Sequence, residues 1–219
     1  IRYIKSTLDQ MGVTYKDDGS AYGWLLKDLE SGPKDGDQWD LIILAAEDKN
    51  GIKANFFDST MLAIDQGTSV ILEVYYLDGT HQSSASGLLN QCGLEYENNW
   101  IRIPPSRAVL FPLSPDNPIL QQPNSGLGFS STTEFWWDPN GIIDYDIGDL
   151  MKLSSDSKAT LLIGATANTP SFHGSSTVCM DGKLILQTIS SHVLTYDNMS
   201  PLWENYIYHA LRTRYNNLN

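Results

Sequence analysis

The chain has 219 residues, of which 41% are hydrophobic and 18% are charged. This length suits one large domain or two small ones, and the apolar content excludes a largely disordered chain. The 14 basic and 26 acidic residues give a formal net charge of -12. That balance argues against nucleic acid or an anionic membrane surface as the main partner, because both require clustered Lys and Arg. No apolar run reaches about eighteen residues, so we expect no membrane insertion.

The chain begins with helical signals. A first helix is predicted by four apolar residues at helical spacing: Ile1, Ile4, Leu8 and Met11. Gly12 is its expected stop, and 13–15 is predicted as a short strand. A second helix is predicted from Tyr22 to Leu29, ended by Gly32. A doubly wound fold normally opens on a strand, so we expect the first strand before Ile1, in a longer parent chain.

Two short, nearly continuous apolar runs follow. Residues 39–46 (WDLIILAA) and 68–77 (TSVILEVYYL) have the pattern of strands buried on both faces of a parallel sheet. A helix is predicted between them over 56–65, and another begins after them at a cap on Ser83 or Ser84. Strands and helices that alternate at these lengths predict a doubly wound sheet with right-handed crossovers.

The middle of the chain has a different composition. Prolines crowd the stretch 104–123, where we predict turns and extended segments, with a short strand at 107–110. Residues 134–149 (EFWWDPNGIIDYDIGD) are aromatic and acidic. They are interpreted either as a loop that covers part of the core or as a lid or recognition surface, since long loops in compact domains serve one of these purposes.

Regular structure is predicted again in the last third. We expect a strand over 159–165, then a hairpin whose strands flank Asp181-Gly182. Ser200-Pro201 marks the start of the final helix, whose apolar face comprises Trp203, Ile207, Ala210 and Leu211. The chain is therefore predicted to be a single three-layer α/β domain over 1–219. Its sheet is mostly parallel and doubly wound, with a C-terminal β-hairpin and an irregular Pro-rich insertion at about 104–158.

The two cysteines leave two readings open. Cys92 and Cys179 are either two buried thiols or one disulfide formed in an oxidising compartment, and their spacing does not decide between these. Neither a CxxC pair nor a Cys-His pair with zinc spacing occurs, and no glycine-rich phosphate loop is present. We therefore expect no metal and no cofactor.

The stretch KLILQTISSHVLTYDNMSPLWENYIYHAL, residues 183–211, carries a family resemblance. Together with the order of elements, it resembles the class I glutamine amidotransferase-like fold, a flavodoxin-like arrangement also found in trehalose-utilisation-type proteins. In that family a hairpin strand delivers a histidine, and a terminal helix carries an Asn near its start. His192 and Asn205 occupy these positions here. The Leu-Trp-x-Asn-Tyr-Ile pattern of the helix is also similar to bacterial envelope or secreted proteins.

The sequence departs from the family at two of the three catalytic positions. The family's nucleophilic Cys lies on a sharp turn after a central strand, but Asp78-Gly79 follows the strand here, and Cys92 comes later on a predicted helix. The family's Glu stands two residues after the histidine, where this chain has Leu194. The resemblance thus implies the fold and argues against glutamine hydrolysis.

Candidate site residues stand where strands end, because open α/β sheets bind ligands beyond the carboxyl ends of their strands. His192 is either a general base or a histidine bonded to the backbone at a strand end. Glu73 lies inside an apolar run, so it either sits near the strand end, pairs with an Arg, or serves as a general acid or base with a raised pKa. In an enzyme the catalytic set would be His192, Glu73 and Asp78.

Aromatic residues supply the candidate ligand-binding set. Trp136-Trp137 can stack on sugar rings or on a partner protein, or can fill the core beneath a loop. The full set of predicted binding residues is Glu47, Tyr75, Tyr76, Trp136 and Trp137.

Three functions remain open, and we favour the first. It is a non-catalytic, degenerate amidotransferase-like domain that binds a protein partner or carbohydrate beside other domains of a secreted or envelope protein. The alternative is a hydrolase rearranged around His192, with Glu73, Asp78 or Glu47 as acid, orienting group or metal ligand. The third is a purely structural domain.

Overall fold

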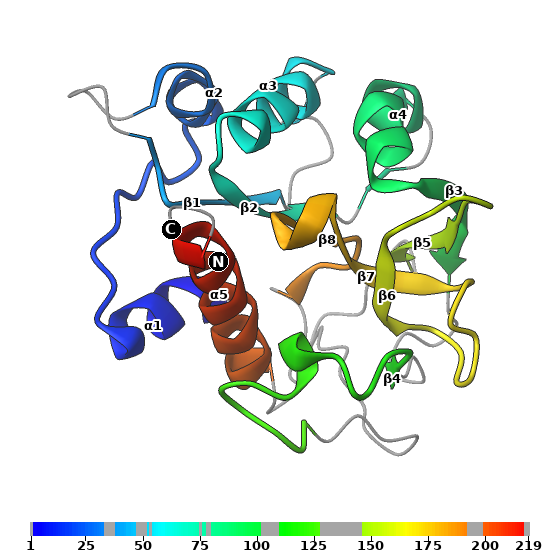
Figure 1. Cartoon of the computed structure of the whole chain (residues 1–219). Helices are drawn as coiled ribbons and strands as arrows, with labels where there is room; N and C mark the ends of the chain where they lie inside the picture. Colours follow the sequence, from blue (N-terminus) through cyan, green and yellow to red (C-terminus); the bar gives the residue numbers. More distant parts are fainter. Residues whose placement is uncertain are drawn as a thin grey trace.

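A computed structural model of the chain describes residues 2–32, 38–46, 52, 54–74, 76–77, 80–101, 110–127, 146–191 and 199–216. Helices cover both faces of one eight-stranded sheet (Figure 1). The helices are α1 (Arg2–Met11), α2 (Tyr22–Ser31), α3 (Ala54–Asp65), α4 (Thr80–Cys92) and α5 (Met199–Asn216). The strands are β1 (Leu41–Ala46), β2 (Ser69–Val74), β3 (Leu94–Ile101), β4 (Phe111–Pro112), β5 (Asp146–Leu153), β6 (Thr160–Gly164), β7 (Gly174–Cys179) and β8 (Leu184–Gln187).

The sheet is parallel at one end, over β1, β2 and β8, and antiparallel over the rest. Its main path runs β1-β2-β8-β7-β5-β3, while β6 pairs with β7 and β4. β2 is parallel to both β1 and β8, and the remaining ladders are antiparallel. The C-terminal hairpin is confirmed as β7 and β8, joined through the 3-10 turn η3 (Met180–Gly182).

Alternation along the central strands creates two hydrophobic cores. Val70 and Leu72 of β2 pack toward α2, α3 and α4, whereas Ile71 packs toward α1 and α5. Figure 1 shows the same division, with α1 and α5 on one face of the sheet and the other three helices on the opposite face. The predicted three-layer α/β architecture is thereby confirmed.

The helix ends at Gly12 and Gly32 agree with the prediction, but the short strand at 13–15 was wrong. The Val13 N–H donates to the Leu8 carbonyl, so this residue closes the last turn of α1 instead of pairing with a strand. Tyr15 is partly exposed, and its hydroxyl donates to Asp9. Val13 and Tyr15 therefore make hydrogen bonds to α1. The high β-propensity of Val and Tyr led to the incorrect prediction of a strand.

Two helix starts also differ from the sequence-based expectation. α4 begins at Thr80, so Ser83 and Ser84 lie inside the helix and are not its cap. α5 begins at Met199, one residue before Ser200. Ser83 and Ser84 resemble capping residues by residue type alone, which is why sequence reasoning placed the start of α4 too late, and the start of α5 differs by a residue or two.

Three strands were missed, one of them the two-residue β4. β3 contains several polar residues, yet its Leu94 and Trp100 are buried, and it pairs with β5 along its length. β5 runs through the segment 146–153, so part of the predicted irregular insertion and of the aromatic, acidic loop is sheet. Of the strand expected at 107–110, the structure describes only Leu110, which belongs to no strand.

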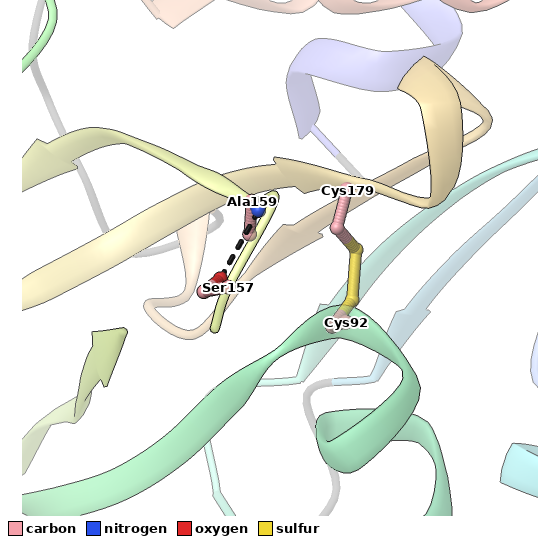
Figure 2. The surroundings of a disulfide bond; sticks show 4 residues. All are labelled: Cys92, Ser157, Ala159 and Cys179. Atoms are coloured by element: carbon pink, nitrogen blue, oxygen red, sulfur yellow. Dashed lines mark hydrogen bonds between the residues drawn. A yellow bond between two sulfur atoms is a disulfide. The ribbon is translucent and has the colours of Figure 1, made fainter. Parts of the chain in front are cut away.

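The two cysteines form a disulfide between layers. Cys92 ends α4 and Cys179 ends β7, and their Cα atoms lie 5.3 Å apart (Figure 2). Both residues are buried. Of the two readings left open by the sequence, the structure shows the disulfide, which fastens the α4 layer to the centre of the sheet.

No helix in the described part of the chain is long and apolar enough to cross a membrane.

Candidate functional site

A row of polar side chains crosses the central strands on the face covered by α5. Glu73 is the second-last residue of β2, and it is the register partner of Gln187 on β8. Gln187 is in turn the register partner of Ser176 on β7. All three side chains are buried, and Glu73 is only 1% exposed. Strand pairing alone therefore places a carboxyl, an amide and a hydroxyl side by side near the carboxyl end of the parallel strands.

The Glu73 carboxyl accepts hydrogen bonds from two directions. Gln187 Nε2 donates to Oε2 at 2.6 Å, and the Ser191 backbone N–H donates to Oε1 at 3.1 Å. The Ser191 side chain forms a further hydrogen bond with this carboxyl. Both carboxyl oxygens are thus occupied by groups of the fold itself, as a buried polar group requires.

Helix α5 extends this network from the other side. Trp203 Nε1 donates to Ser191 Oγ at 3.0 Å, and the Tyr206 hydroxyl donates to Gln187 Oε1 at 3.2 Å. Tyr206 is also hydrogen-bonded to Ser176 Oγ at 2.7 Å. We call these residues the Glu73 cluster: Glu73, Ser176, Gln187, Ser191, Trp203 and Tyr206.

Two opposing effects act on the pKa of Glu73. Burial favours the neutral acid, and the hydrogen bonds from Ser191 and Gln187 favour the carboxylate. Burial is the larger effect, so the pKa rises from 4.5 to about 7. Burial likewise raises the pKa of Tyr206, and the nearby Glu73 adds to the rise. The cluster therefore contains one group, Glu73, that exchanges its proton near neutral pH.

A second buried carboxylate holds the strand ends together. Asp149 of β5 accepts a hydrogen bond from the Leu77 backbone N–H, just beyond β2. The Asp149 backbone N–H donates to the Thr188 carbonyl at 2.9 Å, and Thr188 Oγ1 donates to the Asp149 carbonyl at 2.6 Å. The segment 134–149 thus ends within β5, where Asp149 binds backbone groups of the core.

The predicted site residues divide sharply. Glu73 lies near the strand end, as one reading of its sequence position held, and among the described residues it accepts hydrogen bonds from Gln187 and Ser191 and not from an Arg. Tyr76 is half-buried just beyond β2. The other predicted residues lie outside the described part of the chain: Glu47, Tyr75, Asp78, Trp136, Trp137 and His192.

Sequence reasoning missed most members of the Glu73 cluster. Gln187, like Glu73, is a lone polar residue near the end of an apolar strand. This shared position could have indicated that the two side chains pair. Trp203 was assigned only to the apolar face of the last helix. Its indole N–H and the Tyr206 hydroxyl need partners when buried, which could have pointed to a polar core beneath α5.

Asn205, which the family resemblance singled out, has a structural role in this chain. Its Oδ1 accepts from the Asn124 backbone N–H, and its Nδ2 donates to the Asn124 carbonyl, both at 2.9 Å. Asn205 is fully buried. The side chain thus pairs with the backbone of the proline-rich segment and fixes that segment against α5.

Among the described residues, no group of three or more His, Cys, Asp or Glu side chains is arranged to hold an ion. His173 is instead held by one carboxylate. Glu97 accepts from its backbone N–H at 2.7 Å and lies 2.9 Å from its Nδ1.

No family model matches the chain, and no curated protein matches it. Among solved structures it is similar to one described as the mmIFT52 N-terminal domain, with a TM-score of 0.48 and 11% sequence identity. The match covers 96% of this chain and 89% of that one. Similarity at this level assigns neither a family nor an activity.

Proposed function

We propose that the chain is a non-catalytic, degenerate amidotransferase-like domain that binds a protein partner or a carbohydrate. The observation that carries the non-catalytic part is the state of the sulfur atoms. The chain has two cysteines, and both are consumed in the Cys92–Cys179 disulfide. A thiolate is the nucleophile in cysteine-dependent acyl transfer, so the oxidised chain lacks the group that glutamine hydrolysis by this fold would require.

The Glu73 cluster supports the same proposal. A general acid or base must reach the proton of a substrate or of a water molecule. Glu73 is 1% exposed, and its two oxygens accept from Gln187 and Ser191. A carboxyl whose bonding capacity is satisfied inside the core stabilises the fold rather than a transition state.

The second candidate is a hydrolase centred on His192, and one observation favours it. Glu73 has a pKa of about 7, and it is bonded to Ser191, the residue before His192. Perturbed carboxyl groups of this kind concentrate at active sites. The burial of both Glu73 and Ser191 weighs against this candidate, because neither offers a substrate an open approach.

The disulfide also supports an extracellular or envelope location. Disulfides persist in oxidising compartments and are rare in reducing ones. Neighbouring domains of a longer parent protein are the expected context, and the binding role falls to the predicted surface around Trp136 and Trp137.

One experiment separates the two candidates. The oxidised chain is screened for binding on a carbohydrate array, and for release of ammonia from glutamine and of nitrophenol from p-nitrophenyl acetate. Glycan binding that is lost in Trp136→Ala/Trp137→Ala supports the carbohydrate form of the proposal. The matched control is Trp24→Ala, because Trp24 is 60% exposed on α2. Turnover of either substrate that is lost in His192→Ala would contradict the proposal.

A further inference from the structure

We propose that the Glu73 cluster is a proton-sensitive joint between the sheet and α5, in which proton uptake by Glu73 rearranges the hydrogen bonds of Trp203 and Tyr206. This role is independent of any ligand, so it goes beyond the proposed binding function. It makes the packing of the last helix responsive to pH near neutrality.

The present hydrogen bonds suit an ionised Glu73. Gln187 Nε2 and the Ser191 backbone N–H can only donate, so both carboxyl oxygens act as acceptors. The Tyr206 hydroxyl donates to Gln187 Oε1, which fixes the amide with its nitrogen toward Glu73. Donors from β8 and from the segment after β8 therefore converge on one carboxylate, and α5 is linked to it through Gln187 and Ser191.

A protonated Glu73 cannot keep every one of these bonds unchanged. Its O–H becomes a donor and needs an acceptor. One available acceptor is Ser191 Oγ, which already accepts from Trp203 Nε1. The other is Gln187 Oε1 after rotation of the amide, which would remove the present acceptor of the Tyr206 hydroxyl. The first route turns the Ser191 hydroxyl, which is the acceptor of the Trp203 indole, from a donor into an acceptor toward Glu73. The second route changes the bond made by Tyr206.

The affected hydrogen bonds belong to residues at the centre of the packed face of α5. Trp203 and Tyr206 are both fully buried, and their rings meet edge to face with centroids 5.7 Å apart. Tyr206 also bonds Ser176 on β7. A single proton on β2 is thus linked to β8, β7 and α5 through hydrogen bonds in a buried, low-dielectric region, where each bond depends on its neighbours.

The groups around Glu73 leave it as the titrating member of the cluster. From β1, β8 and β7 it faces neutral residues, respectively Ala45, Gln187 and Ser176 in register across the strands. From α5 it faces Tyr206, whose pKa is raised by burial, so this phenol stays protonated near neutral pH.

Burial raises the pKa of Glu73 to about 7, which sets the pH at which the joint would respond. His209 is the titratable imidazole elsewhere on α5, and burial together with Arg212 lowers its pKa below 6.5. His192 follows Ser191 directly but lies outside the described residues. Both histidines must be distinguished from Glu73 in any titration.

The test follows the indole N–H resonance of Trp203 by two-dimensional ¹H–¹⁵N NMR of the full chain between pH 5 and 9. Loss of one signal in Trp203→Phe assigns it among the six tryptophans. We expect a titration step centred near pH 7 in the wild type, and no step in Glu73→Gln. His209→Gln and His192→Gln should retain the step.

A second variant keeps the test decisive if Glu73→Gln fails to fold. Ser191→Ala removes the acceptor of Trp203 Nε1 while retaining the Glu73 carboxyl. It should abolish the step at Trp203 but leave one at the side-chain amide of Gln187. A Trp203 resonance that does not titrate in the wild type would overturn the proposal, as would a step that persists in Glu73→Gln.

Discussion

Gln187 and Glu73 stand directly opposite each other on two parallel strands, and Gln187 Nε2 donates to Glu73 Oε2 at 2.6 Å. The register of β2 and β8 therefore places a buried acid beside its donor at the edge where α/β sheets commonly bind ligands. In this chain the position is closed by α5, whose Tyr206 completes the contact to Gln187. At this edge Glu73 is part of the core.

The first prediction concerns stability and pH. The folded pKa of Glu73 is about 7 against an ordinary value of 4.5, so the native state holds this proton more tightly than the unfolded chain does. The resulting stabilisation is fully present below pH 4.5 and is lost as the pH rises through 7. Relative to Glu73→Gln, the wild-type free energy of unfolding should fall by roughly 2–3 kcal/mol between pH 5 and pH 8.

Urea unfolding at several pH values measures this difference. Glu95→Gln serves as the control, because Glu95 is exposed and paired with Lys152 on the sheet surface. Its pH dependence should follow that of the wild type. Parallel curves for the wild type and Glu73→Gln would show that Glu73 titrates normally.

The second prediction concerns the disulfide. Cys92 and Cys179 are separated by 87 positions, so the bond removes a large loop-closure entropy from the unfolded chain. The oxidised wild type should be more stable than Cys92→Ala/Cys179→Ala by about 3–5 kcal/mol. Dithiothreitol should lower the unfolding midpoint of the wild type alone. Equal midpoints for the oxidised wild type and the double variant would count against a structural disulfide.

The third prediction concerns Gly148 in β5. Its φ is +143°, and an added Cβ would lie 2.9 Å from Ile189 Cα and closer still to the Thr188 carbonyl oxygen. Gly148→Ala should therefore destabilise the fold by about 2–4 kcal/mol. Gly23→Ala is the matched control, because nothing lies within 4 Å of its added Cβ on α2. That helix substitution should instead stabilise by about 0.5–1 kcal/mol.

The fourth prediction concerns Asn205. Its side chain pairs with both the N–H and the carbonyl of Asn124, so Asn205→Ala would leave two backbone groups without these partners. We expect a loss of about 2–3 kcal/mol in chemical unfolding. Asn216→Ala changes an exposed residue of the same helix and should have almost no effect. Comparable losses in the two variants would contradict the structural role assigned to Asn205.

The parts of the fold that could be predicted are those with continuous apolar patterns. The runs 41–46 and 69–74 became β1 and β2, because strands covered by helices on both faces are largely apolar, with Glu73 as the charged exception. The Asp181-Gly182 turn located the hairpin for a similar local reason. In each case the signal resides within a few adjacent residues.

The parts that escaped prediction depend on distant partners. β3 and β5 carry acids and amides, and their strand character comes from pairing with each other. The burial of Asp149 becomes understandable only once Leu77 and Thr188 are seen beside it. A sequence pattern reflects only adjacent residues. The environments of β3, β5 and Asp149 are created by chain segments that lie far apart in sequence.

The candidate site shows the same division. Glu73 could be singled out because one acid interrupts an apolar strand. The environment of that acid is set by Gln187, Ser191 and two residues of α5, Trp203 and Tyr206, and this environment bears on whether its role is catalytic or structural. The pairing of β2 with β8, which the sequence alone did not specify, brings these groups to it.

The most direct test of the account is whether Glu73 is accessible. Carboxyl groups of the native, oxidised chain are labelled with a water-soluble carbodiimide and glycine ethyl ester, and the sites are mapped by mass spectrometry. Glu95 is an exposed internal reference, and labelling in urea shows that both residues can react. We predict that Glu73 stays unlabelled in the native chain while Glu95 reacts. Labelling of native Glu73 at the rate of Glu95 would contradict it and point to an open active site.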